Sequence, residues 1–508
     1  MDISPCNGCR RRDAVIAGLE GRVSRLEAEL ARQRQLAQRL EGVVRRLTER
    51  LAQYEPEVRR EANSAEPRRG DPNDSQSRAA SEHYSVDAEM RRRYRRRRRK
   101  KSPGRQPTEL KFAEAERVEE IYPPELPVIR RSECRIARER AVWRLENGRA
   151  VRVGYRIFTA TGYDEPRIPG VTPRCEYGIE ILVVLAFLVY IIGLSLDKAC
   201  VVLGFFCQLP LAKSQADALL RQLAQHWEVE FSYLCDLIAH AAVVYLDETG
   251  WRVGREKLSL WALASSLQRV FWFGCNKDDE TLDLLLPPDV FDGVGVSDDA
   301  GVYQGRFRRA QKCWAHLLRK TIRLALLYPH QRSYQRFLDR LLQLYRDAQR
   351  VAEDGRLGDE GRKCRVAELE DRLCQLCIPF NRAVTPAMKP HEQEFTNLVQ
   401  ELIRLLLAEE LFTFVLVPGV ESTNNSMERL LRGPALDRKA GRINQTPAGA
   451  YRRSVIVSVL ESLRINLKRF DLASVVDEVK RWLREGASLF AEQWQTAIPA
   501  PAVTLDSG

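Results

Sequence analysis

The sequence predicts a multidomain, mainly α-helical protein with one α/β core and an N-terminal coiled coil. Three observations predict this fold class. A heptad pattern runs through residues 19–54, short apolar runs typical of strands follow one another between residues 243 and 296, and residues 330–415 have a helical pattern almost throughout. The chain has 508 residues, more than one usual domain, so two to four structural units are expected.

Composition narrows the partners and the compartment. The net charge of +12 favours a polyanion, either nucleic acid or an anionic membrane surface. The twelve cysteines are scattered and no secretory signal opens the chain, which indicates a reducing, cytoplasmic location. The longest apolar stretch, residues 179–196, contains Glu180 and a break at Gly193. It therefore predicts a buried core helix, and no membrane partner is expected.

Residues 1–60 are predicted to form a coiled coil that joins two copies of the chain into a homodimer or a higher assembly. Apolar positions recur at spacings of four and three, with Gln33 as the polar exception, at Leu19, Val23, Leu26, Leu30, Gln33, Ala37, Leu40, Val44, Leu47, Leu51 and Tyr54. A lone amphipathic helix folding back on the protein is the alternative. Cys6 and Cys9 precede the heptads, and two copies would supply four thiolates for zinc. A single CxxC pair is a weak signal, so zinc there stays an open alternative.

Residues 61–127 are predicted to be a basic linker without a fixed structure. Residues 61–80 are polar and aperiodic, and residues 91–101 are basic except for Tyr94. Such a run repels itself until it meets phosphate, and it would add affinity without choosing a sequence. The residues singled out for DNA contact in this run are Arg95, Arg96, Arg97 and Arg98. A solvated basic tail is the alternative.

Two small units are expected before the core. Residues 128–176 alternate weakly and contain Gly and Pro, which predicts a small β-rich module. Residues 177–238 are helical in pattern, with a short helix at 194–202, a turn at 204–210 and a second helix at 211–227. That outline is typical of a DNA-binding helix-turn-helix, although any helical hairpin gives the same outline.

The α/β core is predicted in two parts, residues 239–329 and 416–470, separated by a helical insertion at 330–415. Strands are expected at 243–246, 258–264, 270–274 and 294–296, and helices at 281–286 and 306–327. Residues 424–484 are expected to hold two or three helices, and residues 471–508 a C-terminal helix and tail.

Three acidic residues are the candidates for chemistry. Asp247 and Asp298 each follow an apolar run that predicts a strand, and strand ends present side chains to a ligand on a rigid scaffold. Glu428 follows Asn424 and Asn425, which are typical of a helix N-cap. Carboxylate oxygens suit hard divalent cations, and phosphodiester chemistry uses two such ions.

Four motifs give these residues a family context. Residues 246–251 read LDETGW, residues 296–303 VSDDAGVY, residues 312–320 KCWAHLLRK and residues 424–429 NNSMER. In sequence and in order they resemble the signatures of the insertion sequence 66 family of transposases. The resemblance covers roughly residues 170–465.

The resemblance implies a DDE transposase with an RNase H-like core. It assigns the catalytic, metal-binding roles to Asp247, Asp298 and Glu428, with two Mg²⁺ or Mn²⁺ ions as cofactors. It also indicates a group of residues that support the site: Trp251, Cys313, His316, Asn424 and Asn425. His316 has the alternative of an ordinary core histidine. Asp299 stands where the family usually has Gly, so Asp299 and Glu248 are adjacent carboxylates that the motif register does not select.

The same resemblance bears on zinc and on DNA. Relatives carry a zinc module built from two CxxC-like pairs before the helix-turn-helix, whereas here only Cys134 stands near the expected place. Residues 128–176 are therefore expected to be a degenerate zinc ribbon without its metal. Further phosphate contacts are predicted at Arg319, Lys320, Arg429, Arg432, Arg438, Lys439 and Arg442.

The predicted function is a cut-and-paste transposase. It would bind double-stranded DNA at the transposon ends, cut there with metal ions and join the ends to target DNA, with helper proteins of the same element as further partners. The alternatives are a catalytically inactive, transposase-derived protein that binds or bridges DNA, and an RNase H-like nuclease that only hydrolyses.

Overall fold

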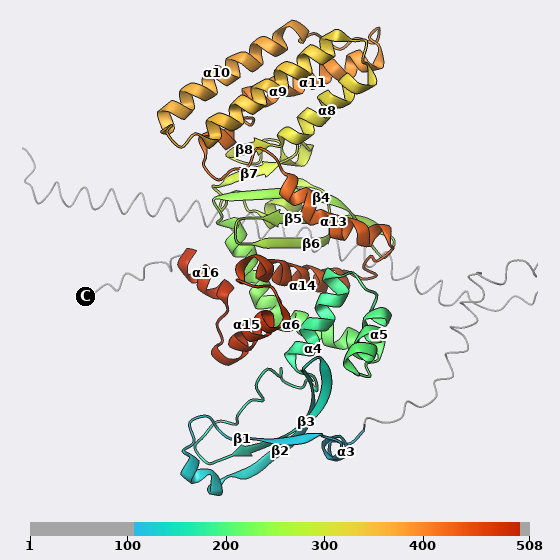
Figure 1. The fold of residues 1–508 in the computed structure, drawn as a ribbon, viewed down its shortest axis with the longest axis vertical. Coiled ribbons are helices and arrows are strands. Elements are labelled where there is room, and N and C mark those ends of the chain that lie inside the picture. Colours follow the sequence, from blue (N-terminus) through green and yellow to red (C-terminus); the bar gives the residue numbers. More distant parts are fainter. Residues whose placement is uncertain (1–105, 498–508) are drawn as a thin grey trace, which may run out of the picture. The chain divides into compact units, whose positions relative to one another are not determined.

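The computed structural model describes residues 106–497. Several predictions fall outside this range: the coiled coil, the Cys6/Cys9 pair and the basic run with Arg95, Arg96, Arg97 and Arg98. Figure 1 gives the course of the chain and the labels of its elements.

The first described unit is a three-stranded sheet of order β1-β3-β2. Its elements are α3 (Thr108–Ala113), β1 (Arg117–Ile121), the 3₁₀ turn η1 (Val128–Glu133), β2 (Arg135–Glu146) and β3 (Arg149–Thr159). Strands β2 and β3 form an antiparallel hairpin closed by Asn147 and Gly148, which both have the positive φ that a type I′ turn requires. Strand β1 pairs with β3 in parallel.

This sheet corrects one predicted boundary. The linker was expected to reach residue 127, but α3 and β1 lie inside that range. Residues 117–121 read RVEEI, too short and too charged to signal a strand, and they are strand only because β3 supplies the hydrogen bonds. Cys134 is a free, half-buried thiol.

A helical segment follows the sheet. It comprises α4 (Ile179–Ala186), a π-helical turn η2 (Phe187–Ile191), α5 (Leu196–Cys207) and α6 (Lys213–Ala239). Helix α4 is buried on nearly all sides, and Glu180 within it forms an ion pair of 2.8 Å with Arg144. No helix among residues 106–497 is both long and apolar enough to cross a membrane.

Helices α5 and α6 have the outline of a helix-turn-helix with altered bounds. The first helix runs on to Cys207, so the turn follows at residues 208–212, and α6 continues to Ala239, well beyond the predicted end. The added length of α6 is a core segment with buried Phe231, Leu234 and Ile238.

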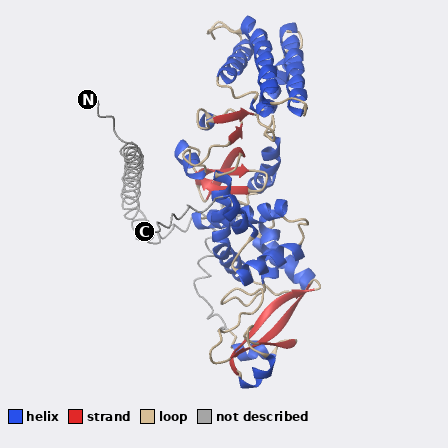
Figure 2. Ribbon diagram, turned by 90° about the vertical axis from the view of Figure 1, so that its left-hand side faces the viewer, coloured by secondary structure: helices blue, strands red, loops and turns tan. Residues whose placement is uncertain are grey.

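The central sheet has five strands in the order β6-β5-β4-β7-β8. Its elements are β4 (Val243–Val253), β5 (Glu256–Ala264), β6 (Arg269–Cys275), α7 (Asp279–Leu285), β7 (Val294–Ser297), the 3₁₀ turn η3 (Gly301–Tyr303) and β8 (Arg309–Lys312). Strands β4, β5 and β6 are antiparallel neighbours, whereas β7 runs parallel to β4 and β8 parallel to β7. This mixed sheet is consistent with an RNase H-like core (Figure 2).

Two predictions about these strands were wrong. Strand β4 does not end at Asp247 but continues to Val253, because antiparallel pairing with β5 supports the polar residues that follow. The segment 306–327 was predicted to be all helix, yet it opens with β8. Gln311 and Lys312 of β8 are buried polar residues, and so they give no apolar strand pattern.

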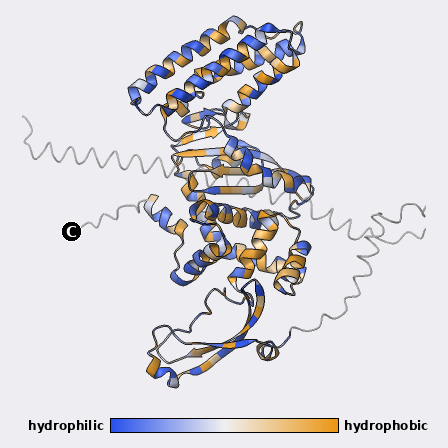
Figure 3. Cartoon of the chain, in the orientation of Figure 1, coloured by the Kyte–Doolittle hydropathy of each residue, from blue (hydrophilic) through white to orange (hydrophobic). Residues whose placement is uncertain are grey.

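The insertion and α8 (Trp314–Leu327) share a second hydrophobic cluster. The insertion holds α9 (Arg332–Glu353), α10 (Asp359–Cys377), the 3₁₀ turn η4 (Ile378–Phe380), α11 (Pro390–Leu407) and α12 (Thr413–Leu416). Figure 3 shows hydrophobic and hydrophilic residues mixed along α9, α10 and α11, as expected for amphipathic helices.

Four helices complete the described chain: α13 (Asn425–Lys439), α14 (Pro447–Asn466), α15 (Leu472–Glu485) and α16 (Leu489–Ala497). The last two replace the single C-terminal helix that was expected. Helix α14 packs along β6, the edge strand of the sheet. The hydroxyls of Ser454, Ser458 and Ser462, one helical turn apart, accept hydrogen bonds of 2.8–2.9 Å from alternate backbone N–H groups of β6. This serine ladder satisfies donors that no further strand pairs with.

Candidate active site

Asp247 and Asp298 occupy matching positions on neighbouring strands. The last parallel pair of β4 and β7 is Tyr245 with Val296, and each aspartate lies two residues further along its own chain. Neighbouring strands are about 4.8 Å apart, and residues two apart in a strand share a face. The register therefore brings both carboxylates to the same face of the sheet near the C-terminal end of β7, although only Asp298 stands at a strand end.

The pKa of Asp247 is raised by burial and by the carboxylates around it. Burial, the charges of Glu248 and Asp298, and a smaller contribution from Glu428 together raise the pKa of Asp247 to about 7. The main chain opposes the shift, because the N–H of Glu248 donates a 2.9 Å hydrogen bond to Asp247 Oδ1. Such an environment favours a proton or a cation near the carboxylate.

A relay of hydrogen bonds ties together the backbones that carry the three acids. The N–H of Cys313 donates to the carbonyl of Ser297 at 2.9 Å, next to Asp298. Cys313 Sγ accepts from the N–H of Asn424 at 3.1 Å. Asn424 Nδ2 then donates to the carbonyl of Leu246 at 2.7 Å, next to Asp247. The N-terminus of α13 is thereby fixed against β4 and β7.

Glu428 lies in the first turn of α13, where its N–H bonds to the Asn424 carbonyl at 3.2 Å. Its carboxylate pairs with the guanidinium of Arg319, and His316 Nε2 lies 3.6 Å from the same oxygen. Among residues 106–497, no group of three or more His, Cys, Asp or Glu side chains is close enough to hold a metal ion. The backbone of Glu428 lies near the aspartates, but its carboxylate pairs with Arg319.

The donor set nevertheless suits a hard cation. Asp247 and Asp298 offer carboxylate oxygens, the type of ligand that magnesium and manganese prefer. The raised pKa of Asp247 reflects uncompensated negative charge at this edge, which a divalent cation would neutralise. These two residues fit the metal, and Glu428 would join them only by leaving Arg319.

The residues predicted to support the site divide into two groups. Cys313 and Asn424 are buried and form the hydrogen-bond relay, and His316 lines a cavity of about 220 Å³ together with Asp298. His316 is therefore not an ordinary core histidine. Trp251 is buried, and its indole N–H donates to Asn444 Oδ1 at 3.0 Å. Asn425 is half-buried at the start of α13.

The carboxylates adjacent to the candidate acids have other partners. Glu248 accepts from the hydroxyl of Tyr303 and pairs with Lys277. Asp299 pairs with Arg404 of α11, so a residue of the insertion contacts the loop that carries Asp298. Neither carboxylate is free to replace Asp247 or Asp298.

Sequence reasoning missed Arg404, Lys312 and Glu401. Lys312 is almost fully buried, donates to Ser297 Oγ at 3.3 Å, and burial lowers its pKa. Glu401 pairs with Lys320 at 2.6 Å beside Asp298 and Asp299. Lys312 is the first residue of the motif at 312–320 and could have been singled out, whereas nothing in the sequence of α11 marks Arg404 or Glu401.

The cations predicted to contact DNA fall into a paired group and an unpaired group. Arg319 and Lys320 are engaged by Glu428 and Glu401. Arg438 donates to Thr249 Oγ1 at 3.0 Å and to the Gly250 carbonyl, and Arg442 lies 3.3 Å from Asp437. The remaining three are exposed on α13, and their side chains have no ion pair or hydrogen bond within the described chain: Arg429, Arg432 and Lys439.

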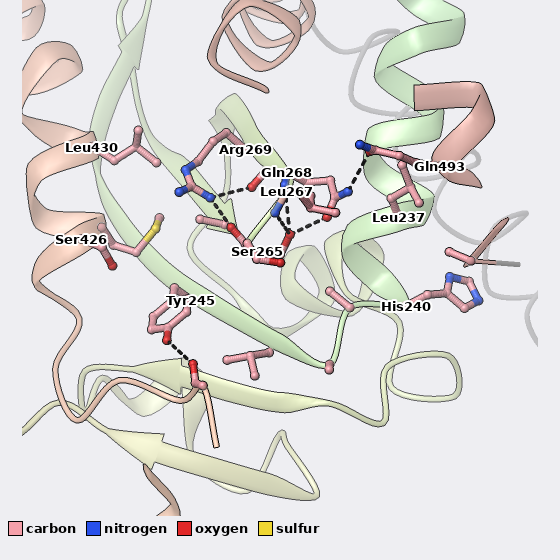
Figure 4. Close-up of a pocket in the computed structure, with 18 of the residues that line it drawn as sticks. Leu237, His240, Tyr245, Ser265, Leu267, Gln268, Arg269, Ser426, Leu430 and Gln493 are labelled. Atoms are coloured by element: carbon pink, nitrogen blue, oxygen red, sulfur yellow. Dashed lines mark hydrogen bonds between the residues drawn. The ribbon is translucent and has the colours of Figure 1, made fainter. Parts of the chain in front are cut away.

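A larger cavity, about 880 Å³, opens elsewhere, between the start of β4, the β5–β6 turn, α13 and α16 (Figure 4). Its polar groups mostly satisfy one another: Arg269 donates to the Gln268 carbonyl at 2.9 Å, and Gln268 donates to Gln493 at 3.3 Å. It contains none of the three candidate acids, so its size does not make it the reactive centre.

Comparison with known families gives one match. Residues 174–452 match the family described as Transposase IS66 family. The matched range contains the whole central sheet, the insertion and all three candidate acids. A comparison with curated proteins finds no match to the chain.

Proposed function

Because the chain belongs to the IS66 family of transposases, we propose that it is an active DDE transposase that cuts DNA at transposon ends and joins them to a target. Membership implies DNA transposition, polynucleotidyl transfer and, in general, divalent metal ions. The observation that supports activity most strongly is the matched register of Asp247 and Asp298 on β4 and β7. Two carboxylates at one rigid edge are the minimum that shared metal binding requires.

In this proposal Asp247 and Asp298 hold two Mg²⁺ or Mn²⁺ ions, and Glu428 completes the ligand set. Bound divalent ions activate the attacking oxygen and stabilise the leaving oxygen of a phosphodiester. Arg319 is about half exposed, so it can exchange Glu428 for a DNA phosphate. His316 lies beside Glu428 and orients its carboxylate during that exchange.

DNA would be bound by several parts of the chain. At the N-terminus of α6, Lys213, Ser214 and Gln215 are exposed, as the reading end of a helix-turn-helix requires. Phosphate contacts are proposed at Arg95, Arg96, Arg97, Arg98, Arg319, Lys320, Arg429, Arg432, Arg438, Lys439 and Arg442. The coiled coil of residues 1–60 would pair two copies and their DNA ends, with helper proteins of the same element as further partners.

One observation favours a second candidate function. Since Glu428 pairs with Arg319 and not with the aspartates, the chain also fits a transposase-derived protein that binds or bridges DNA without cutting it. The two candidates differ in one property, which is metal-dependent nicking of the cognate terminal repeats.

The test uses purified full-length protein, DNA carrying the terminal repeats, and Mg²⁺ or Mn²⁺. Asp247→Asn and Glu428→Gln should each leave DNA binding within about twofold and abolish strand transfer. Asp289→Asn is the matched control, because Asp289 is exposed and makes no side-chain hydrogen bond or ion pair in the described chain. Full strand transfer by either acid variant would falsify the assignment. Absence of nicking by the wild type would favour the binding protein.

A further inference from the structure

We infer that the tip of the β4–β5 hairpin, with Arg252, Arg255 and Lys257, is a contact surface for the DNA backbone. This inference rests on the proposed function and deepens it, since it assigns a second place at which the same DNA substrate is held. None of these three residues belongs to the family motifs in the sequence.

The tip carries an unbalanced positive charge, three cations against one acid, Glu256. All three side chains are exposed and make no hydrogen bond or ion pair within residues 106–497. Arg252 and Lys257 are moreover direct cross-strand partners in the register of β4 and β5. Like charges placed directly opposite on two strands destabilise the pair. An external anion that neutralises both would remove that cost.

The hairpin tip is connected to the candidate site by α13. Helix α13 runs beside β4 in the same direction, from the acids to the hairpin tip (Figure 1). Three hydrogen bonds mark the course: Asn424 to Leu246 at 2.7 Å, Arg438 to Thr249 at 3.0 Å, and the N–H of Gly254 to the Asn444 carbonyl at 2.8 Å.

That course is lined with free cations. Arg429, Arg432 and Lys439 of α13 are exposed and unpaired in the described chain, and they lie between Glu428 and the residues that meet the hairpin. A strip of positive charge therefore leads from the acids to the tip. Phosphate is attracted along such a strip without regard to base sequence.

The distance from Asp247 to the hairpin tip suits a bound duplex. Arg252 lies five residues beyond Asp247 on β4, which is about 17 Å at the rise of a strand. Duplex DNA carries one charge per about 1.7 Å of its axis when both strands are counted. A length of about 17 Å therefore holds about ten charges, which is about five base pairs. The odd spacing places the side chain of Arg252 on the opposite face of β4 from Asp247, so a duplex whose reacting phosphate lies at Asp247 would meet the hairpin first at Arg255, in the turn between β4 and β5.

The experiment measures how the binding of a 40-base-pair duplex of arbitrary sequence depends on salt. Full-length protein is used in EDTA, so that no cleavage occurs. Phosphate contacts release counterions, and each contributes about 0.9 to the slope of log K against log salt. The variant Arg252→Ala/Arg255→Ala/Lys257→Ala should flatten that slope by about 2 to 3. The matched control is Arg332→Ala/Arg336→Ala/Arg340→Ala, which removes the same charge from exposed positions of α9 that are likewise unpaired in the described chain.

An unchanged slope in the hairpin variant would overturn the inference, and so would an equal flattening in the control. Thermal unfolding of both variants checks that the fold is retained, and loss of the Arg252–Lys257 repulsion should leave the hairpin variant no less stable than the wild type. The failure of the proposed function is a separate result, because it appears as strand transfer by Asp247→Asn and not as a change in this slope.

Discussion

The side-chain amide of Asn424 donates a 2.7 Å hydrogen bond to the main-chain carbonyl of Leu246. These residues are far apart in the sequence, yet the bond fixes the first turn of α13, and with it Glu428, beside the residue that precedes Asp247. Asn424 is almost fully buried, so no water can replace the bond without a rearrangement.

Asn424→Ala is therefore expected to destabilise the fold by about 1 to 3 kcal/mol, since it leaves the Leu246 carbonyl without its partner. Strand transfer should fall further than stability alone explains, because Glu428 loses its fixed position. Urea unfolding and strand-transfer rates measure the two effects. Asn425→Ala is the control, as Asn425 is half-buried and its side chain makes no hydrogen bond in the described chain. Equal losses in both variants would contradict this role.

The raised pKa of Asp247 predicts a pH dependence of stability. The folded protein holds the Asp247 proton up to about pH 7, whereas the unfolded chain releases it near pH 4, the ordinary value for aspartate. The folded state thus binds more protons in this window, and stability contributed by the protonated carboxyl is lost as the pH rises from 4 to 7. Asp247→Asn should remove that loss.

The measurement is urea unfolding of the metal-free protein between pH 4 and 8. The variant should gain on the wild type with rising pH, by up to about 4 kcal/mol. Mg²⁺ or Mn²⁺ at pH 7.5 should stabilise the wild type and leave the variant nearly unchanged, because the ligand that binds the folded state is missing. A difference that is constant over the whole pH range would contradict the assigned shift.

The serine ladder between α14 and β6 should contribute measurably to stability. Ser458 is fully buried and accepts from the N–H of Phe271 at 2.8 Å. Ser458→Ala leaves that N–H unpaired, which is expected to cost about 1 to 3 kcal/mol. Hydrogen exchange of the Phe271 amide should quicken relative to its neighbours. Ser426→Ala, at a half-buried serine whose side chain has no hydrogen bond in the described chain, should change neither quantity.

The contact between Asp299 and Arg404 should couple the insertion to the loop that carries Asp298. Asp299 is mostly buried, and one of its oxygens has no hydrogen-bond partner. In a double-mutant cycle with Asp299→Ala and Arg404→Ala, we expect a coupling energy of about 0.5 to 3 kcal/mol in urea unfolding. The charge-swapped pair Asp299→Arg/Arg404→Asp should recover part of the lost strand transfer. A coupling energy of zero would show that the pair does not link the two regions.

Much of the helical organisation could be predicted from the sequence. The helical pattern of residues 330–415 is matched by α9, α10 and α11, since periodic apolar positions within each helix mark it in the sequence. Strands β5, β6 and β7 were also found, because each is an apolar run bounded by polar residues. These elements follow from local composition, which a pattern records directly.

The features that the sequence did not predict depend on tertiary contacts. Strand β8 is held by hydrogen bonds such as that from Gln311 Nε2 to the Leu411 carbonyl at 3.1 Å, and no local pattern encodes them. The same holds at the site. Asp298 stands at a strand end as the sequence predicted, but Asp247 lies inside β4, and the pairing of Glu428 with Arg319 joins residues on different helices and had no signal in the sequence.

Helix α14 has a consequence for assembly that reaches beyond a single copy. An edge strand with free N–H and C=O groups is a template on which another chain can add a strand, which is the usual route to unwanted aggregation. At β6 that template is occupied, because the hydroxyls of Ser454, Ser458 and Ser462 already bond to it. A second copy of the chain would therefore find these three donors of β6 already occupied and could not extend the sheet there without displacing α14.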